Sequence, residues 1–277
     1  KFVSKKNANS YAFGDFLLSY ANYQIFTLNY KDAGKYLDDY FTYRNKFPEF
    51  DKELAIAHYN AGYVYRRSGN YKKAMQHFRK ALTVTMTADS ANQQLLGTIM
   101  TTIGGMMRFM GNPSDAEVQL LEAEKVLYSS SRETRNFRLA LLYASVGNIK
   151  YDAGDYYLAL KYYKKAERVF NSSGYDNYNN IALNLNNQAK CHMNTGNYQK
   201  AIEILNKVFD LPGISNDVKV NTYKNLAKLH AITDNKKKAG FYYREGINQA
   251  EKTNKSNFIA ASIFYGYATF LKNEKKY

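Results

Sequence analysis

A small residue recurs through this chain at intervals close to 41 residues. Six alanines mark the repeat, separated by 41, 42, 43, 42 and 38 residues: Ala33, Ala74, Ala116, Ala159, Ala201 and Ala239. Another small residue stands twelve positions before each of them: Ala21, Gly62, Gly104, Gly147, Ala189 and Ala227. A seventh, Ala268, begins a unit that stops at Tyr277. Because a fixed period of roughly 20 to 50 residues is typical of repeat architectures, this spacing restricts the fold more than any other feature.

The turn inside each unit is marked by a residue seven positions after the small one. Four units have glycine there: Gly69, Gly111, Gly154 and Gly196. Glycine enters the left-handed conformation that ends a helix at little cost, so the pattern predicts a helix, a turn and a second helix. In the first and sixth units Leu28 and Asp234 take the place of the glycine.

A capping residue follows each turn glycine. The four residues with a side-chain oxygen able to cap the second helix are Asn70, Asn112, Asp155 and Asn197. In the third unit Pro113 intervenes, and Ser114 with Glu117 is the predicted capping box there.

The order of small, aromatic and turn residues resembles the tetratricopeptide repeat, a helix-turn-helix unit of about 34 residues. The second unit shows the resemblance most fully, with Gly62, Tyr65, Gly69, Tyr71, Ala74, Phe78 and Ala81 in the expected order. The longer period is similar to that of kinesin light chains, Pins-type polarity adaptors and bacterial peptide-sensing regulators. The resemblance implies an all-α, right-handed α-α superhelix of about six and a half repeats in which stacked helix pairs share one core. A single solenoid domain is expected over 1–277, with repeats at 12–45, 53–87, 95–128, 138–171, 180–210, 217–250 and a partial one at 259–277.

Chemistry-bearing residues do not form a catalytic pattern in the sequence. Cys191 and His192 are adjacent, but neighbours on a helix point about 100° apart and do not face each other. A metal would need a third ligand near His192 and His230, and the other histidines, His58 and His77, are units away. The glycines between Gly97 and Gly111 lack the spacing and lysine of a phosphate-binding loop. We therefore expect a protein that is not an enzyme and that binds no cofactor or metal.

Positive charge is the most informative property of the composition. Lys and Arg outnumber Asp and Glu by 39 to 24, a net charge of +15. A coding bias towards Lys, Asn and Tyr would give the same totals, so position matters more than number. Nucleic acid is the less favoured partner, because the units do not carry the regular two- or three-residue code of helical repeats that read bases. Binding that falls steeply with salt would be its signature.

A protein-interaction module is the main hypothesis. It takes two forms that the sequence leaves open: a standing adaptor, or the sensing part of a larger signalling or transcriptional regulator, as in bacterial regulators with repeats of this length. No apolar run is long enough to span a bilayer, and the compartment is left open. Apolar residues on the last helix, Phe264, Tyr267 and Leu271, predict that a further helix follows in the native protein, because terminal repeats carry a polar capping face.

In proteins of this family the first helix of each unit lines a concave groove. Five positions, counted from the small residue, face that groove: three and two before it, one after it, and four and five after it. They select Tyr59, Asn60, Arg66, Arg67, Arg108, Asn148, Tyr151, Asn186, Asn187, Lys190, Lys224, Asn225, Lys228 and Lys272. Seven of these are cations, against two acids, Asp15 and Asp152.

Asparagine amides both donate and accept, as an extended peptide backbone requires, and the lysines would select carboxylates. The predicted ligand is thus an extended acidic segment of a partner protein. Its anchors are Asn187, Lys190, Lys224, Asn225 and Lys228, resembling the clamp by which some family members grip acidic tails. The alternative is a solvated basic face with no ligand.

Overall fold

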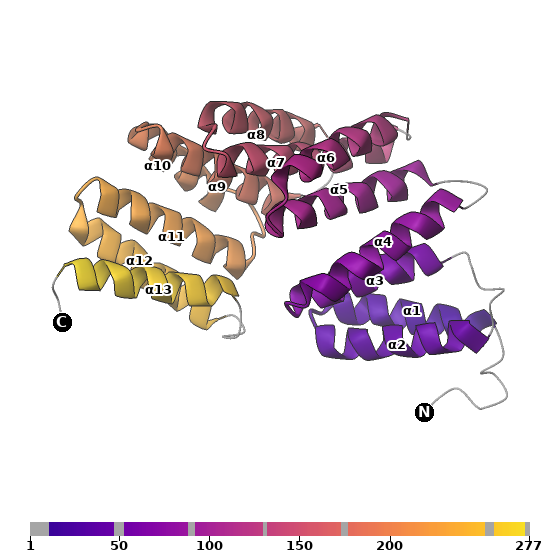
Figure 1. The fold of residues 1–277 in the computed structure, drawn as a ribbon. Helices are drawn as coiled ribbons and strands as arrows, with labels where there is room; N and C mark the ends of the chain where they lie inside the picture. The colour runs from indigo at the N-terminus through magenta and orange to yellow at the C-terminus, as the bar shows by residue number, and fades with distance from the viewer. Residues whose placement is uncertain are drawn as a thin grey trace. The chain divides into compact units, whose positions relative to one another are not determined.

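The computed structural model describes residues 11–46, 53–87, 92–129, 132–172, 177–252 and 258–274. Within these ranges every regular element is an α-helix, which confirms the all-α class. The chain divides into two compact units, 1–131 and 132–277. The first contains α1 (Tyr11–Phe26), α2 (Tyr30–Lys46), α3 (Leu54–Arg67), α4 (Tyr71–Thr87), α5 (Gln93–Phe109) and α6 (Pro113–Tyr128) (Figure 1). The second contains α7 (Arg132–Asp152), α8 (Tyr156–Asn171), α9 (Tyr178–Asn194), α10 (Tyr198–Phe209), α11 (Asn216–Ile232), α12 (Lys236–Glu251) and α13 (Phe258–Asn273).

Each unit is built from antiparallel helix pairs packed in chain order. In the first unit α1 pairs with α2, α3 with α4 and α5 with α6, and each pair packs on the next through α2 against α3 and α4 against α5. In the second unit α7 pairs with α8, α9 with α10 and α11 with α12, and α13 packs on α11 and α12. None of the helices in the described ranges is both long and apolar enough to cross a membrane.

The turns within the pairs all use the left-handed conformation. The four glycines predicted from the repeat have positive φ: Gly69 (79°), Gly111 (87°), Gly154 (81°) and Gly196 (77°). Leu28 (φ 62°) and Asp234 (φ 56°) adopt the same conformation, although L-residues with a side chain pay a steric penalty there. The geometry of the turn is therefore imposed by the packing of the two helices and not only by glycine.

The helix caps agree in part with the sequence prediction. Asn70 and Asp155 accept hydrogen bonds from the backbone N–H of Lys73 (3.2 Å) and Leu158 (3.0 Å), as expected. In the third pair the predicted capping box is wrong: the helix begins at Pro113, and Asn112 is the cap. Proline fits the first helical position because its missing N–H would have no intrahelical partner there.

Asn197 also departs from the prediction, because its side chain accepts no capping hydrogen bond. Its amide Nδ2 instead donates to the hydroxyl of Thr195 at 2.9 Å. An asparagine after the turn glycine thus predicts where the second helix begins, but it does not always form the capping hydrogen bond.

The small residues allow close approach of the two helices of a pair. A Cβ added to Gly62 would lie 2.6 Å from the ring of Phe78, and one added to Gly147 would lie 2.7 Å from the ring of Tyr163. Both aromatic rings are fully buried. In these two pairs the aromatic residue four positions after the repeat alanine therefore lies against the backbone of the partner helix, and glycine leaves room for it where even alanine would clash.

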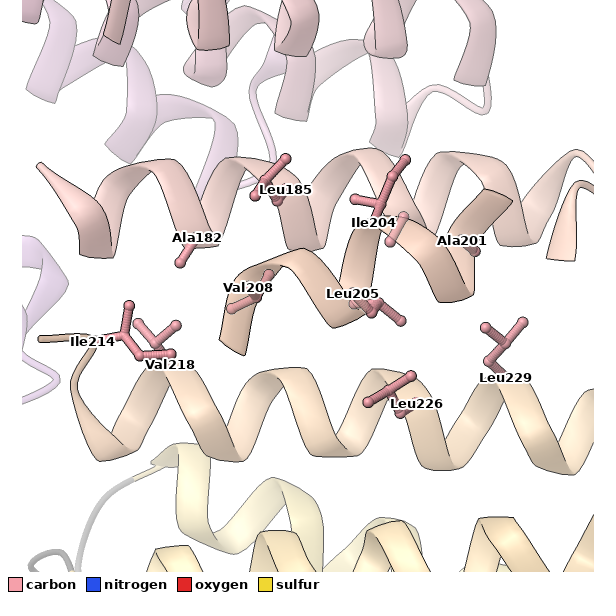
Figure 2. Packing of buried hydrophobic residues seen from close by; sticks show 11 residues of the cluster. Ala182, Leu185, Ala201, Ile204, Leu205, Val208, Ile214, Val218, Leu226 and Leu229 are labelled. Atoms are coloured by element: carbon pink, nitrogen blue, oxygen red, sulfur yellow. The ribbon is translucent and has the colours of Figure 1, made fainter. Parts of the chain in front are cut away.

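A continuous core joins neighbouring pairs, as the cluster between α9, α10 and α11 shows (Figure 2). Leu205 and Val208 of α10 lie between the other two helices, with Ala182 and Leu185 on one side and Leu226 on the other (Figure 2). An isolated pair would leave this apolar face in water, so the stacking of pairs is what stabilises each of them.

Candidate functional site

The first unit holds five of the sequence-predicted site residues. Tyr59 and Asn60 of α3 are partly buried, and Arg108 of α5 is also partly buried. Asn60 donates through Nδ2 to Oδ1 of Asn22 on α1 at 2.5 Å. The hydroxyl of Tyr59 lies 3.3 Å from that of Thr102 on α5. The first helices α1, α3 and α5 are thus joined by side-chain hydrogen bonds on the face that the repeat counting selected.

The two arginines of α3 are exposed and lie over tyrosine rings. The guanidinium of Arg67 is 5.2 Å from the ring centroid of Tyr30, and its Nε donates to the Tyr30 hydroxyl at 3.1 Å. Arg66 lies 5.3 Å from the ring centroid of Tyr63. Stacking on aromatic faces holds these cations in place while leaving the charge accessible.

Asparagines connect the first helices of the second unit in the same way. Asn187 of α9 donates through Nδ2 to Oδ1 of Asn148 on α7 at 3.2 Å, and the Tyr163 hydroxyl donates to the same oxygen at 2.8 Å. Asn148 follows a small residue and Asn187 precedes one by two positions, as do Asn22 and Asn60 in the first unit. Asn22 stands at a counted position but was not selected as a site residue. The repeated spacing of these asparagines in the sequence could have predicted the hydrogen bonds between neighbouring first helices.

Two of the predicted residues, Asn186 and Asn225, lie in the interior. Asn186 is 0% exposed and Asn225 is 4% exposed. Asn225 donates to Oδ1 of Asn186 at 2.8 Å, and Asn186 donates to the Thr222 hydroxyl at 2.9 Å. Their amides therefore join α9 to α11, whereas the counting placed them on the groove surface. Counting assigns a direction from the helix axis, but it does not account for the neighbouring helix that covers the position.

Three lysines gather on α9 and α11. Lys224 is partly buried, and its Nζ donates to the Ser262 hydroxyl of α13 at 3.1 Å. Burial, together with the nearby charges of Lys228 and Lys190, lowers the pKa of Lys224 to about 8. We call Lys190, Lys224 and Lys228 the lysine cluster. Ser262 was not predicted from the sequence, since the contact depends on how α13 packs against α11.

Lys224 and Lys228 differ from other lysines in the described residues in having no acidic partner. In the described parts of the chain neither Lys224 nor Lys228 forms an ion pair, and the groups that act on the pKa of Lys224 are cations. Other lysines do pair with acids, as Lys35 does with Asp32 (3.1 Å) and Lys200 with Glu203 (2.9 Å). Lys224 is thus a partly buried ammonium group with two further cations beside it.

Tyr151 of α7 and Lys190 of α9 complete the described surface in the second unit. The Nζ of Lys190 lies 4.9 Å from the ring centroid of Tyr151, whose hydroxyl accepts from Asn194 at 2.8 Å. Lys272 is exposed on α13 and Asp152 is exposed at the end of α7. Lys190 thus lies beside Tyr151 and close enough to Lys224 to act on its pKa, and Lys272 is an exposed charge further along the chain.

Cys191 and the histidines do not form a catalytic arrangement in the described residues. Burial raises the pKa of the Cys191 thiol to about 11, so the thiol stays protonated and unreactive at neutral pH. His58 and His77 are brought together in one pair of helices, with their Nδ1 atoms 3.1 Å apart. Burial lowers the pKa of both. This contact was not predicted from the sequence. Its signal is that residues on either side of one turn face each other in an antiparallel helix pair.

A known family of proteins matches the sequence of this chain. The tetratricopeptide repeat model matches residues 53–129 and 138–212, more than half of the length. The chain belongs to the tetratricopeptide repeat family. No curated protein sequence matches it.

Solved structures of similar fold include two complexes. NprR in complex with its cognate peptide NprX has a TM-score of 0.72 at 17% identity, over 99% of this chain and 79% of that one. A Rap protein complexed with competence and sporulation factor has a TM-score of 0.68 at 13% identity, over 98% and 78%. The APC/C hetero-tetramer Cut9-Hcn1 gives 0.67 at 14%, over 93% of this chain but only 43% of that chain. At these identities the similarity shows the fold alone.

Proposed function

We propose that this chain is a non-enzymatic protein-interaction module that binds an extended, acidic peptide segment. The binding surface lies on the first helices of the second unit, with the lysine cluster as its charged centre. Asn187 contributes hydrogen bonds to the peptide backbone, and Lys272 adds charge at one end. The residues of α3 and α5, including Arg66, Arg67 and Arg108, form a second basic surface in the first unit.

The observation that carries the proposal is the environment of Lys224. A partly buried ammonium loses hydration, and two further cations repel it, so its charge is costly in the free protein. A ligand carboxylate placed among the three amines would remove this cost and gain charge-assisted hydrogen bonds. A solvated basic face would instead keep its lysines in water, with an ordinary pKa.

The asparagines support an extended ligand. Asn187 uses one N–H towards Asn148, which leaves its second N–H and its Oδ1 for a peptide backbone. The buried bond between Asn225 and Asn186 fixes the spacing of α9 and α11, so that Lys190 and Lys228 stay close to Lys224. Asn225 therefore acts in the proposal by positioning the lysines and not by touching the ligand.

A panel of matched peptides tests the proposal. We would measure fluorescence anisotropy of labelled peptides of equal length, one rich in Asp and Glu, one with the corresponding amides, and one with lysines. The proposal expects binding of the acidic peptide only. Equal binding of the amide peptide would contradict the role of the charges.

A single-stranded oligonucleotide of the same net charge as the acidic peptide serves as the control for nucleic acid. The proposal expects it to bind less tightly, because phosphates spaced along a nucleotide backbone do not match a cluster of three lysines. Tighter binding of the oligonucleotide with a steep loss in salt would favour the nucleic-acid alternative.

A second candidate is the sensing part of a larger regulator. It is favoured by the similarity to NprR and Rap, whose structures are named as complexes with a peptide or with a sporulation factor. In a sensor, the ligand must bind two conformations with different affinity. Small-angle scattering with and without the bound acidic peptide separates the candidates: a ligand-dependent change in the radius of gyration indicates a sensor, and an unchanged value indicates an adaptor.

A further inference from the structure

The residue after the repeat alanine is apolar in three of the six second helices, and the other three have Gly34, Glu117 and Gly240 there. Met75, Leu160 and Ile202 stand at this position in α4, α8 and α10. Each packs into the core between its own helix and the next first helix, Met75 together with Met106 of α5, for example. Where the position is apolar, its side chain thus closes the space between one helix pair and the next.

In α2 the same position is Gly34. A Cβ added there would meet only Val64 of α3, at 3.7 Å, which is ordinary contact. Val64 occupies on α3 the place that Met106 occupies on α5, since each lies two residues after the small residue of its unit. The missing side chain at Gly34 therefore leaves open the space that Met75 fills in the next pair.

A pocket of about 420 Å³ occupies this space between α2 and α3. Its floor is formed by Leu37, Ala61 and Val64, which are almost fully buried, and its rim by Tyr30, Lys31 and Tyr65. The volume falls in the range of about 300 to 1,000 Å³ that is usual for ligand sites. Apolar walls of this kind gain free energy when an apolar group displaces water from them.

The rim of the pocket carries charges of both signs. Lys31 and Lys35 line it together with one acid, Asp38, and because Lys35 is paired with Asp32 at 3.1 Å, Lys31 is the lysine of the rim that a ligand would meet. The Tyr30 hydroxyl on the rim accepts a hydrogen bond from Arg67, which brings a third cation to the edge. An apolar group that carries a negative charge beside it fits both the floor and the rim.

We propose that this pocket binds one apolar side chain of a partner polypeptide, of the size of leucine or methionine, with a carboxylate next to it. The partner's side chain would occupy the place that Met75, Leu160 or Ile202 fills in the other pairs. The site is independent of the lysine cluster, because none of its residues belongs to the second unit.

A titration followed by NMR tests the site. The backbone amide signals of Gly34 and Val64 in the complete chain would be followed on addition of N-acetyl-leucine, N-acetyl-leucine amide and N-acetyl-glycine. We expect saturable shifts for N-acetyl-leucine with a dissociation constant on the order of 1 mM, as for a ligand of this size, and weaker binding of the neutral amide. N-acetyl-glycine, which has no side chain for the floor, should cause no saturable shift.

Substitution of the glycine provides the structural control. Gly34→Met should fill the pocket and abolish the shifts, whereas Gly240→Met, at the same repeat position in α12, should leave them unchanged. If Gly34→Met does not fold, Gly34→Ala narrows the pocket and should weaken the binding at least about threefold. Unchanged binding in a folded Gly34 variant, or equal shifts for N-acetyl-glycine, would overturn the proposal. Binding of acidic peptide at the lysine cluster is expected to survive all these substitutions, so the two proposals fail separately.

Discussion

The Nδ2 of Asn225 donates a hydrogen bond of 2.8 Å to Oδ1 of Asn186 in the buried contact between α11 and α9. Asn186 in turn donates to the Thr222 hydroxyl and to the backbone carbonyl of Ala182. A polar chain of this kind is stabilising only while every member keeps its partner, because water does not reach it.

Removal of this bond should cost the protein stability. Asn225→Ala leaves the Asn186 oxygen buried without this donor, and we expect a loss of about 1 to 3 kcal/mol in the free energy of unfolding. Urea unfolding measures it. Asn60→Ala is the matched control, because Asn60 holds the same repeat position in α3 but its bond to Asn22 is exposed to water. It should cost about 0.5 kcal/mol. Equal losses in the two variants would contradict the burial argument.

Glycine should stabilise the turn at Leu28. Leu28 is 66% exposed and held at φ 62°, where a side chain costs about 1 to 2 kcal/mol. Leu28→Gly removes this penalty, and the greater freedom of glycine in the unfolded chain offsets part of the gain. We expect a net increase of about 1 kcal/mol in thermal unfolding experiments.

Two further variants control the turn prediction. Leu28→Ala keeps a Cβ and should give no gain. Asp234→Gly should give less than Leu28→Gly, since aspartate tolerates the left-handed region better than leucine. A loss of stability in Leu28→Gly would show that the leucine side chain contributes packing that its exposed position does not suggest.

The histidine pair should make the first unit sensitive to acid. Burial, together with the charges of His77, Lys80 and Arg44, lowers the pKa of His58 to about 4. The unfolded chain, with a pKa of 6.5, then binds a proton that the folded chain does not, so stability falls as the pH drops through 6.5 towards 4.

For His58 alone the loss amounts to about 2 kcal/mol by about pH 5. The measurement is the free energy of unfolding of the wild type and of His58→Gln at neutral and at acid pH. The variant should lose less than the wild type over this interval. Parallel losses would mean that the His58 pKa is not lowered in the folded protein.

The affinity for an acidic peptide should fall at alkaline pH, because Lys224 loses its proton there. In the free protein this amine has a pKa of about 8, and a bound carboxylate favours its charged form. Affinity for an acidic peptide should therefore be constant below pH 8 and weaken as the pH rises above it. Titration calorimetry over this interval tests the dependence, and Lys224→Gln should remove it. An unchanged slope in Lys224→Gln would assign the pH effect to another group.

The turn positions illustrate what the sequence could predict. Gly69 and the three other turn glycines were found from spacing alone, because a left-handed residue is a local requirement that only a few residue types meet cheaply. Leu28 and Asp234 show the same geometry without the signal, since helix packing can impose it.

The site was predicted less fully, for a physical reason. Spacing from the small residue places Lys190, Lys224 and Lys228 on related faces of α9 and α11, and the structure brings their charges close together. The same spacing cannot tell Asn187, which stays accessible, from Asn186, which is covered by α11. The Ser262 contact, the histidine pair and the pocket at Gly34 depend on packing between helices, which a count along one helix does not contain.

The central claim, that the lysine cluster binds acidic peptide, is tested most directly by the affinity of a paired variant. Titration calorimetry with the acidic peptide would compare the wild type, Lys190→Ala/Lys228→Ala, and Lys72→Ala/Lys125→Ala, which removes the same charge from the first unit. Circular dichroism confirms the fold of each. Each desolvated charged hydrogen bond contributes roughly 1.5 to 3 kcal/mol, so the first variant should bind at least about tenfold more weakly, and the second should differ from the wild type by less than about twofold. Unchanged affinity in a folded Lys190→Ala/Lys228→Ala protein would contradict the claim.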